Sequence, residues 1–183
     1  MSAQSSQKRS RPVPAGPVLH ALLKRIEGRE ARVGIIGQGY VGLPLAIVMA
    51  EAGFSVTGYD IDADKVAELN RGVSYIGDIS DERLRAQRDA ALFRASATFD
   101  DLGDQDVISI CVPTPLSKTR DPDISYIVNA AEQVVARLRK GQVIVLESTT
   151  YPGTTRELLQ PRLEAEGLKV GETVFLAFSP ERV

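Results

Sequence analysis

Residue types that carry much protein chemistry are scarce in this chain of 183 residues, which has one cysteine, one histidine and no tryptophan. The single cysteine, Cys111, excludes an intramolecular disulfide and favours a reducing compartment. The only histidine, His20, lies ahead of the regularly patterned part of the chain, and we assign it no catalytic role. We predict no metal site.

The chain also lacks a strong charge of either sign and a long apolar run. Lys and Arg number 22 against 24 Asp and Glu, a net charge of −2 that predicts no nucleic-acid partner. The apolar stretch 41–50 is too short to cross a bilayer, so we predict no membrane partner. The basic start is not followed by the apolar segment of a signal peptide, and we expect a cytoplasmic protein.

Two regions differ in composition. Residues 1–17 are rich in Ser, Gln and Pro and carry Lys8, Arg9 and Arg11 without an acid. They predict a disordered basic tail, which is either a solvated leader or a contact for an anionic partner. Residues 18–183 predict one folded domain, because 43% hydrophobic and 25% charged residues overall are ordinary globular usage.

Strand and helix patterns alternate along this domain. The predicted strands are 32–36, 54–59, 94–98, 107–112, 143–146 and 173–178. Helices are predicted over 18–28, from the glycines after the first strand to 52, and over 62–71, 80–91, 125–139 and 154–166. Asp62 and Ser80 are suited to N-caps, and Gly141 and Gly167 to helix ends.

The fold class follows from this alternation. Several strands are apolar on both faces, which indicates a parallel sheet covered by helices on both sides. Right-handed crossovers and six strands then favour the α/β doubly wound (Rossmann) sheet with strand order 3-2-1-4-5-6.

A glycine motif follows the first strand. Gly37, Gly39 and Gly42 have the G-x-G-x-x-G spacing, between a strand and a helix. The first glycine permits a tight turn, the second lets a pyrophosphate approach, and the third lets the helix lie close to the strand. The start of the helix adds unpaired amides and a positive dipole end, which together bind phosphate.

An acid stands where this motif needs one. Asp60 ends the second strand, and a carboxylate there accepts hydrogen bonds from the adenosine ribose hydroxyls. It would also repel a 2′-phosphate, and Ile61 and Asp62 offer no cation to neutralise one. The motif and the acid together predict a dinucleotide site with NAD as its cofactor, although Asp60 is also compatible with an ordinary helix-start carboxylate.

Small hydroxyl residues and prolines follow the last three predicted strands, at 112–115, 148–154 and 179–181. In an open α/β sheet the ligand lies outside the carboxyl ends of the strands, so these segments are expected to line its site. Thr149 and Thr154 are also compatible with caps on the following helix.

The ordered motifs of the domain lie at 37–42, 59–65, 111–115, 147–155 and 178–183. Together they resemble the UDP-glucose/GDP-mannose dehydrogenase family, whose members use NAD to oxidise the 6-hydroxyl of a nucleotide sugar to a carboxylate. The resemblance runs from about residue 32 to 183. The strings at 74–76, 123–126 and 146–151 look like the branch that uses UDP-N-acetylglucosamine or UDP-N-acetylmannosamine.

The resemblance implies roles for cofactor-binding residues. The amides of Tyr40 and Val41 would face the pyrophosphate, and Asp60 with Lys65 would bind the adenosine ribose. Thr114 would line the cofactor channel. Lys65 is also compatible with a solvated helix lysine.

For catalysis the resemblance implies Thr149 and Glu181. Thr149 would lie near the nicotinamide and help to hold a water, and Glu181 would lie beside the reacting sugar. A carboxylate and a hydroxyl-held water are able to accept the proton released as hydride leaves the alcohol. Glu181 is also compatible with a helix-start acid.

Members of the family continue into a second α/β domain, which binds the nucleotide sugar and brings a cysteine nucleophile. Cys111 is not that cysteine, because its strand is predicted to be buried. We expect this chain to bind NAD without turning over, and a UDP-sugar substrate and a homodimer to belong to the full-length enzyme. Two alternatives stay open, a non-catalytic NAD-binding module and another Rossmann dehydrogenase acting on a hydroxy acid.

Overall fold

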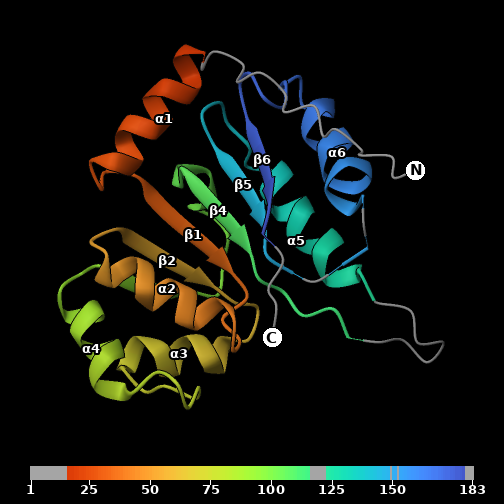
Figure 1. The fold of residues 1–183 in the computed structure, drawn as a ribbon. Helices are drawn as coiled ribbons and strands as arrows, with labels where there is room; N and C mark the ends of the chain where they lie inside the picture. Colours follow the sequence, from red (N-terminus) through yellow and green to blue (C-terminus); the bar gives the residue numbers. More distant parts are fainter. Residues whose placement is uncertain (1–15, 116–122, 149, 152, 180–183) are drawn as a thin grey trace, which may run out of the picture.

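A computed structural model of the chain describes residues 16–115, 123–148, 150–151 and 153–179. One parallel sheet lies at its centre (Figure 1). Its strands are β1 (Arg32–Ile36), β2 (Ser55–Tyr59), β3 (Phe93–Ser96), β4 (Val107–Ile110), β5 (Val143–Leu146) and β6 (Phe175–Phe178). Their order is β3-β2-β1-β4-β5-β6, which confirms the predicted doubly wound sheet.

Helices cover both faces of this sheet (Figure 1). They are α1 (Pro17–Glu27), α2 (Gly42–Glu51), α3 (Ala63–Arg71), α4 (Asp81–Asp89), α5 (Ser125–Val135) and α6 (Gln160–Ala165), with a short 3₁₀ turn η1 (Leu102–Asp104) and a π-helical turn η2 (Thr155–Leu159). Helices α2, α3 and α4 belong to one side, and α5 and α6 to the other.

Two apolar cores result, one on each face of the sheet. Consecutive side chains of a strand point to opposite faces, so Ile35 of β1 packs with α2 while its neighbour Ile36 packs with α5. Both isoleucines are almost completely buried, at 0% and 3% exposure. A strand buried on both faces accounts for the continuous apolar pattern in the sequence.

Side-chain caps begin two of the helices where the sequence predicts them. Asp62 accepts hydrogen bonds from the amides of Asp64 and Lys65 at the start of α3, and Ser80 accepts one from Arg83 at the start of α4. Both caps are local interactions between residues two or three apart, which explains why the sequence is sufficient to locate them.

Two later helices differ from the predicted 125–139 and 154–166. Helix α5 ends at Val135, because Arg139 is engaged outside the helix: its amide donates to Gln142 Oε1 at 2.7 Å and its Nε to the Gly103 carbonyl at 2.6 Å. The last helix begins as the π-helical turn η2, and Pro161, just beyond that turn, has no N–H for a regular α-helical bond.

The predicted tail 1–17 and helix 18–28 also meet at a slightly different point. Helix α1 already begins at Pro17, a residue whose fixed φ suits the first helical turn. The rest of the tail prediction, residues 1–15, lies outside the described residues.

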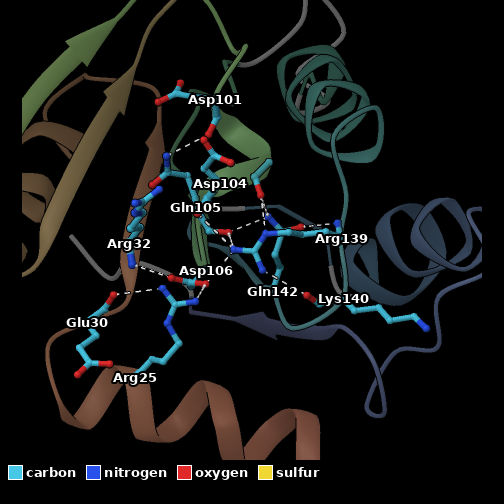
Figure 2. A network of polar contacts seen from close by, with 11 residues as sticks. Arg25, Glu30, Arg32, Asp101, Asp104, Gln105, Asp106, Arg139, Lys140 and Gln142 are labelled. Carbon is cyan, nitrogen blue, oxygen red and sulfur yellow. Dashed lines mark hydrogen bonds and ion pairs between the residues drawn. The ribbon is translucent and has the colours of Figure 1, made fainter.

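At the amino-terminal edge of the sheet, a buried carboxylate joins three elements (Figure 2). Asp106, which is 1% exposed, accepts from Arg25 of α1 at 2.7 Å and from Arg139 at 2.8 Å. Its second oxygen accepts from the backbone amide of Arg32 in β1 at 2.9 Å. This network attaches α1 and the segment after α5 to the sheet, on the edge opposite the carboxyl ends of the strands.

Within the described ranges, no helix combines the length and the apolar character needed to span a bilayer. In the same part of the chain, no group of three or more His, Cys, Asp or Glu side chains is placed to hold a metal ion.

Candidate functional site

A cavity of about 660 Å³ opens at the carboxyl ends of β1, β2, β4 and β5. Its walls are the turn after β1, residues 59–62 with Lys65, the segment 111–114, one side of α5, and the end of β5. The volume lies within the range of small-molecule sites. Seven of the residues predicted to bind a cofactor line it: Gly37, Gly39, Tyr40, Val41, Asp60, Lys65 and Thr114.

The three glycines of the turn after β1 differ in the space around them. Gly37 has a left-handed φ of 93°, and a Cβ there would lie 2.7 Å from the Cys111 carbonyl oxygen. A Cβ at Gly42 would overlap the Gly37 carbonyl, so the third glycine permits α2 to start directly against the turn. A Cβ at Gly39 would meet nothing within 4 Å, which leaves open space beside the backbone at the cavity wall.

Asp60 connects the end of β2 to the glycine turn. Its Oδ2 accepts from the backbone amide of Gln38 at 2.8 Å, and its Oδ1 from the amide of Asp62 at 3.0 Å. A carboxylate offers about four lone-pair positions, so two such bonds leave capacity for ligand hydroxyls. The sequence predicts the acid at the cavity, but not that it also anchors the turn.

Lys65 is the third residue of α3 and lines the cavity. Its Nζ is 3.9 Å from Asp62 Oδ2 and 5.8 Å from the centre of the Tyr75 ring. The structure thus places the predicted lysine at the cavity beside Asp60. Its ammonium group is available to a ribose or a phosphate bound at this wall.

The ends of β4 and β5 form the far side of the cavity. Thr114, Glu147 and Ser148 line it, and the Ser148 hydroxyl donates to the Val112 carbonyl at 2.7 Å, which ties the two strand ends together. The two predicted catalytic residues, Thr149 and Glu181, lie outside the described residues.

Thr154, considered above as a cap, does not cap the following turn through its side chain. Its hydroxyl instead donates to the Tyr151 carbonyl at 2.9 Å and lies 3.0 Å from the Thr150 hydroxyl. These contacts connect Thr154 to residues 150 and 151.

Part of the cavity was not predicted from the sequence. Tyr59 and Phe99 stack with ring centroids 5.6 Å apart and line it from the sheet side, and Asn129 and Gln133 line it from α5. Burial, reinforced by a hydrogen bond to Asp101, raises the pKa of Tyr59 far above its ordinary value, so its hydroxyl stays protonated. Residues 99, 129 and 133 belong to no motif. The packing of α5 over the sheet brings Asn129 and Gln133 to the site, and the segment after β3 brings Phe99.

The described residues fit a dinucleotide. A glycine turn leads into the N-terminus of an apolar ten-residue helix, open space lies at its second glycine, and a carboxylate ends the neighbouring strand. This arrangement at the switch point between β1 and β4 defines the class of the protein: it is a Rossmann-type dinucleotide-binding domain.

Comparison with known proteins identifies the family. Residues 31–183 match the model of the UDP-glucose/GDP-mannose dehydrogenase family, NAD binding domain, and the chain belongs to this family. NAD is therefore its cofactor.

Among curated relatives, the UDP-N-acetyl-D-mannosamine dehydrogenase of Pyrococcus horikoshii is 37% identical over 153 residues, which are 83% of this chain and 36% of that protein. The UDP-N-acetyl-D-glucosamine 6-dehydrogenase of Pseudomonas aeruginosa is 35% identical over 156 residues, 85% of this chain and 36% of the relative. The chain thus spans about 36% of the length of these relatives.

Solved structures agree with these matches. The UDP-D-ManNAc dehydrogenase structure from Pyrococcus horikoshii superposes with a TM-score of 0.78 at 39% identity, over 83% of this chain and 36% of that one. A ternary complex of GDP-mannose dehydrogenase from Pseudomonas aeruginosa superposes with a TM-score of 0.77 at 30% identity, with the same coverage of 83% and 36%.

Proposed function

We propose that this chain is the cofactor-binding part of a nucleotide-sugar 6-dehydrogenase, which oxidises the C6 hydroxyl of a UDP-N-acetylhexosamine to a carboxylate and reduces two NAD. The observation that carries the proposal is the family match over residues 31–183, which contain every wall of the cavity. Relatives named for UDP-N-acetyl-D-mannosamine and UDP-N-acetyl-D-glucosamine support the substrate class.

NAD supplies the hydride acceptor, and this chain holds it. The open backbone at Gly39 and the amides of Tyr40 and Val41, at the start of α2, receive the diphosphate, where unpaired N–H groups and the helix dipole favour negative charge. Asp60 accepts from the adenosine ribose hydroxyls through its remaining lone pairs, and Lys65 approaches the same sugar.

The other predicted cofactor contacts have separate tasks. Gly37 and Gly42 shape the turn, because neither position has room for a side chain. Thr114 lines the channel from the β4 side. Thr149 and Glu181 remain proposals from the family resemblance: Thr149 holds a water near the nicotinamide, and Glu181 stands beside the reacting sugar as a proton acceptor.

The UDP-sugar meets the cofactor through a second domain, such as the additional length of the relatives would provide. We propose that this domain also brings the homodimer contact, that the enzyme works in the cytoplasm, and that its uronic acid product serves polysaccharide biosynthesis. The chain would then bind NAD alone but need the second domain for turnover.

The test has two parts. Calorimetry of the 183-residue chain with NAD is expected to show one binding site. NADH formation is then followed with UDP-N-acetylglucosamine, UDP-N-acetylmannosamine and UDP-glucose, with and without the carboxyl-terminal domain supplied in trans.

We expect NADH only when this second domain is present, and faster with an N-acetylated sugar than with UDP-glucose. Sustained turnover by the chain alone would contradict the division of labour between the domains. NAD binding without turnover in the complemented mixture would favour a non-catalytic module, and turnover with a 2-hydroxy acid instead would favour a different dehydrogenase.

A further inference from the structure

Tyr75 connects a surface segment to the glycine turn. It lies between α3 and α4, in the string at 74–76 that no role above explains, and its hydroxyl donates to the carbonyl oxygen of Gln38 at 2.6 Å. Local bonds hold this segment in place: the Ser74 amide donates to Asp81 Oδ1 at 2.8 Å, and the Ile76 amide to Ser74 Oγ at 3.2 Å. Tyr75 therefore reaches the turn from a segment that is itself anchored.

Gln38, whose carbonyl accepts from Tyr75, is also held by several other contacts. The amide of Gln38 donates to Asp60 Oδ2 at 2.8 Å. Its side chain is completely buried, and Nε2 donates to the Ile35 carbonyl at 2.9 Å while the side-chain amide packs against Gly58. The backbone carbonyl of Gln38 is the one polar group of this residue that points to Tyr75.

The carbonyl of Gln38 and the N–H of Gly39 belong to the same planar peptide unit. Both groups lie in this plane and point in opposite directions, so a hydrogen bond that fixes the direction of the carbonyl also fixes the direction of the N–H. Gly39 has no Cβ and open space around it, which makes this peptide one that would otherwise rotate at little cost.

We propose that Tyr75 is a positioning residue for NAD: by holding the Gln38 carbonyl, it presets the Gln38–Gly39 peptide at the point of the turn where the diphosphate approaches. The inference rests on the proposed role of the glycine turn and adds to it a residue 37 positions beyond Gln38 in the chain. Tyr75 touches no reacting atom, so its effect appears in cofactor affinity and in the order of the turn.

The hydroxyl is suited to this task because it stays a donor. Burial, with Asp60, Asp62 and Glu68 nearby, raises the pKa of Tyr75 far above its ordinary value. The ammonium of Lys65 lies 5.8 Å from the centre of the Tyr75 ring, a distance at which a cation is attracted to the ring face.

The test compares Tyr75→Phe with the unchanged chain by calorimetry, using NAD and ADP-ribose as ligands. Loss of one hydrogen bond that presets the turn is expected to raise both Kd values about fivefold. The two ligands share the diphosphate, so a loss confined to NAD would overturn the proposal. Thr173→Val is the control, because it removes a hydroxyl that accepts from the Lys169 amide at 2.8 Å, and Thr173 is not among the residues that line the cavity.

A second measurement needs no ligand. The Gly39 amide of the ligand-free chain is expected to give one sharp ¹⁵N signal without microsecond-to-millisecond exchange, and to show such exchange in Tyr75→Phe. An exchanging Gly39 in the unchanged chain, or equal Kd values in both chains, would refute the role of Tyr75. Failure of the unchanged chain to bind NAD would refute the proposed function itself. NAD binding by the unchanged chain with no effect of Tyr75→Phe would refute only the role of Tyr75.

Discussion

Replacing Asp60 tests the cofactor site most directly, because its carboxylate has two tasks. It accepts from the amides of Gln38 and Asp62, and in the proposed complex it also accepts from the ribose hydroxyls. Asp60→Ala removes all of these bonds. Asp60→Asn keeps one oxygen, which is able to serve the partly buried Gln38 amide while the new NH₂ group turns toward the exposed Asp62 amide.

The magnitudes of the two variants differ for this reason. A hydrogen bond to a charged group is worth about 1.5–3 kcal/mol, so loss of the ribose contact alone raises the Kd for NAD about tenfold or more in Asp60→Asn. In Asp60→Ala the unanchored turn adds to this, and we expect about a hundredfold. Only Asp60→Ala is expected to lower the melting temperature clearly.

Calorimetry with NAD and NADP, together with thermal unfolding followed by circular dichroism, measures these effects. Removing the negative charge is also expected to narrow the preference for NAD over NADP in Asp60→Asn, since the 2′-phosphate is no longer repelled. Kd values for NAD within about twofold of the unchanged chain in both variants would refute the ribose contact.

Two further predictions concern stability and the shape of the turn. Asp106→Ala is expected to lower the free energy of unfolding in urea by about 3 kcal/mol, the low end for a broken buried ion pair, because Arg25 and Arg139 keep access to water. The control Glu51→Gln, in an exposed pair with Arg83, is expected to lower it by at most about 1 kcal/mol, and equal effects of the two variants would show that Asp106 does not anchor α1. Gly42→Ala is expected to lower the melting temperature and abolish NAD binding, because its Cβ overlaps the Gly37 carbonyl. Gly39→Ala, in contrast, is expected to fold normally and only to raise the Kd for NAD. A stable Gly42→Ala chain that binds NAD would contradict the close contact between the start of α2 and the glycine turn.

Much of the fold was predictable because its signals are local. Alternation of apolar strands with helices is sufficient for the parallel sheet and its strand order, and Asp62 and Ser80 cap the helices that they precede. The start of α5 at Ser125 was predicted correctly. Its carboxyl end was not, since Arg139 bonds to partners more than 30 residues away, and the π-helical turn was not predicted either.

The candidate site divides in the same way. Gly37, Gly42 and Asp60 were predicted, because a spacing of glycines and an acid after the next strand is a sequence pattern with a mechanical reason. Phe99 and the bond from Tyr75 to the glycine turn were not. No motif contains Phe99, and the string at 74–76 indicates a branch of the family without indicating this contact.

Residue order alone was thus enough to establish a doubly wound sheet, a glycine turn and an acid at its carboxyl edge, since each depends on neighbours within one strand, turn or helix. Folding added the contacts between distant segments: the second set of bonds on Asp60, the aromatic wall beside α5, and the hold of Tyr75 on Gln38. Such contacts arise from how the layers pack, and no local pattern of residue types encodes them.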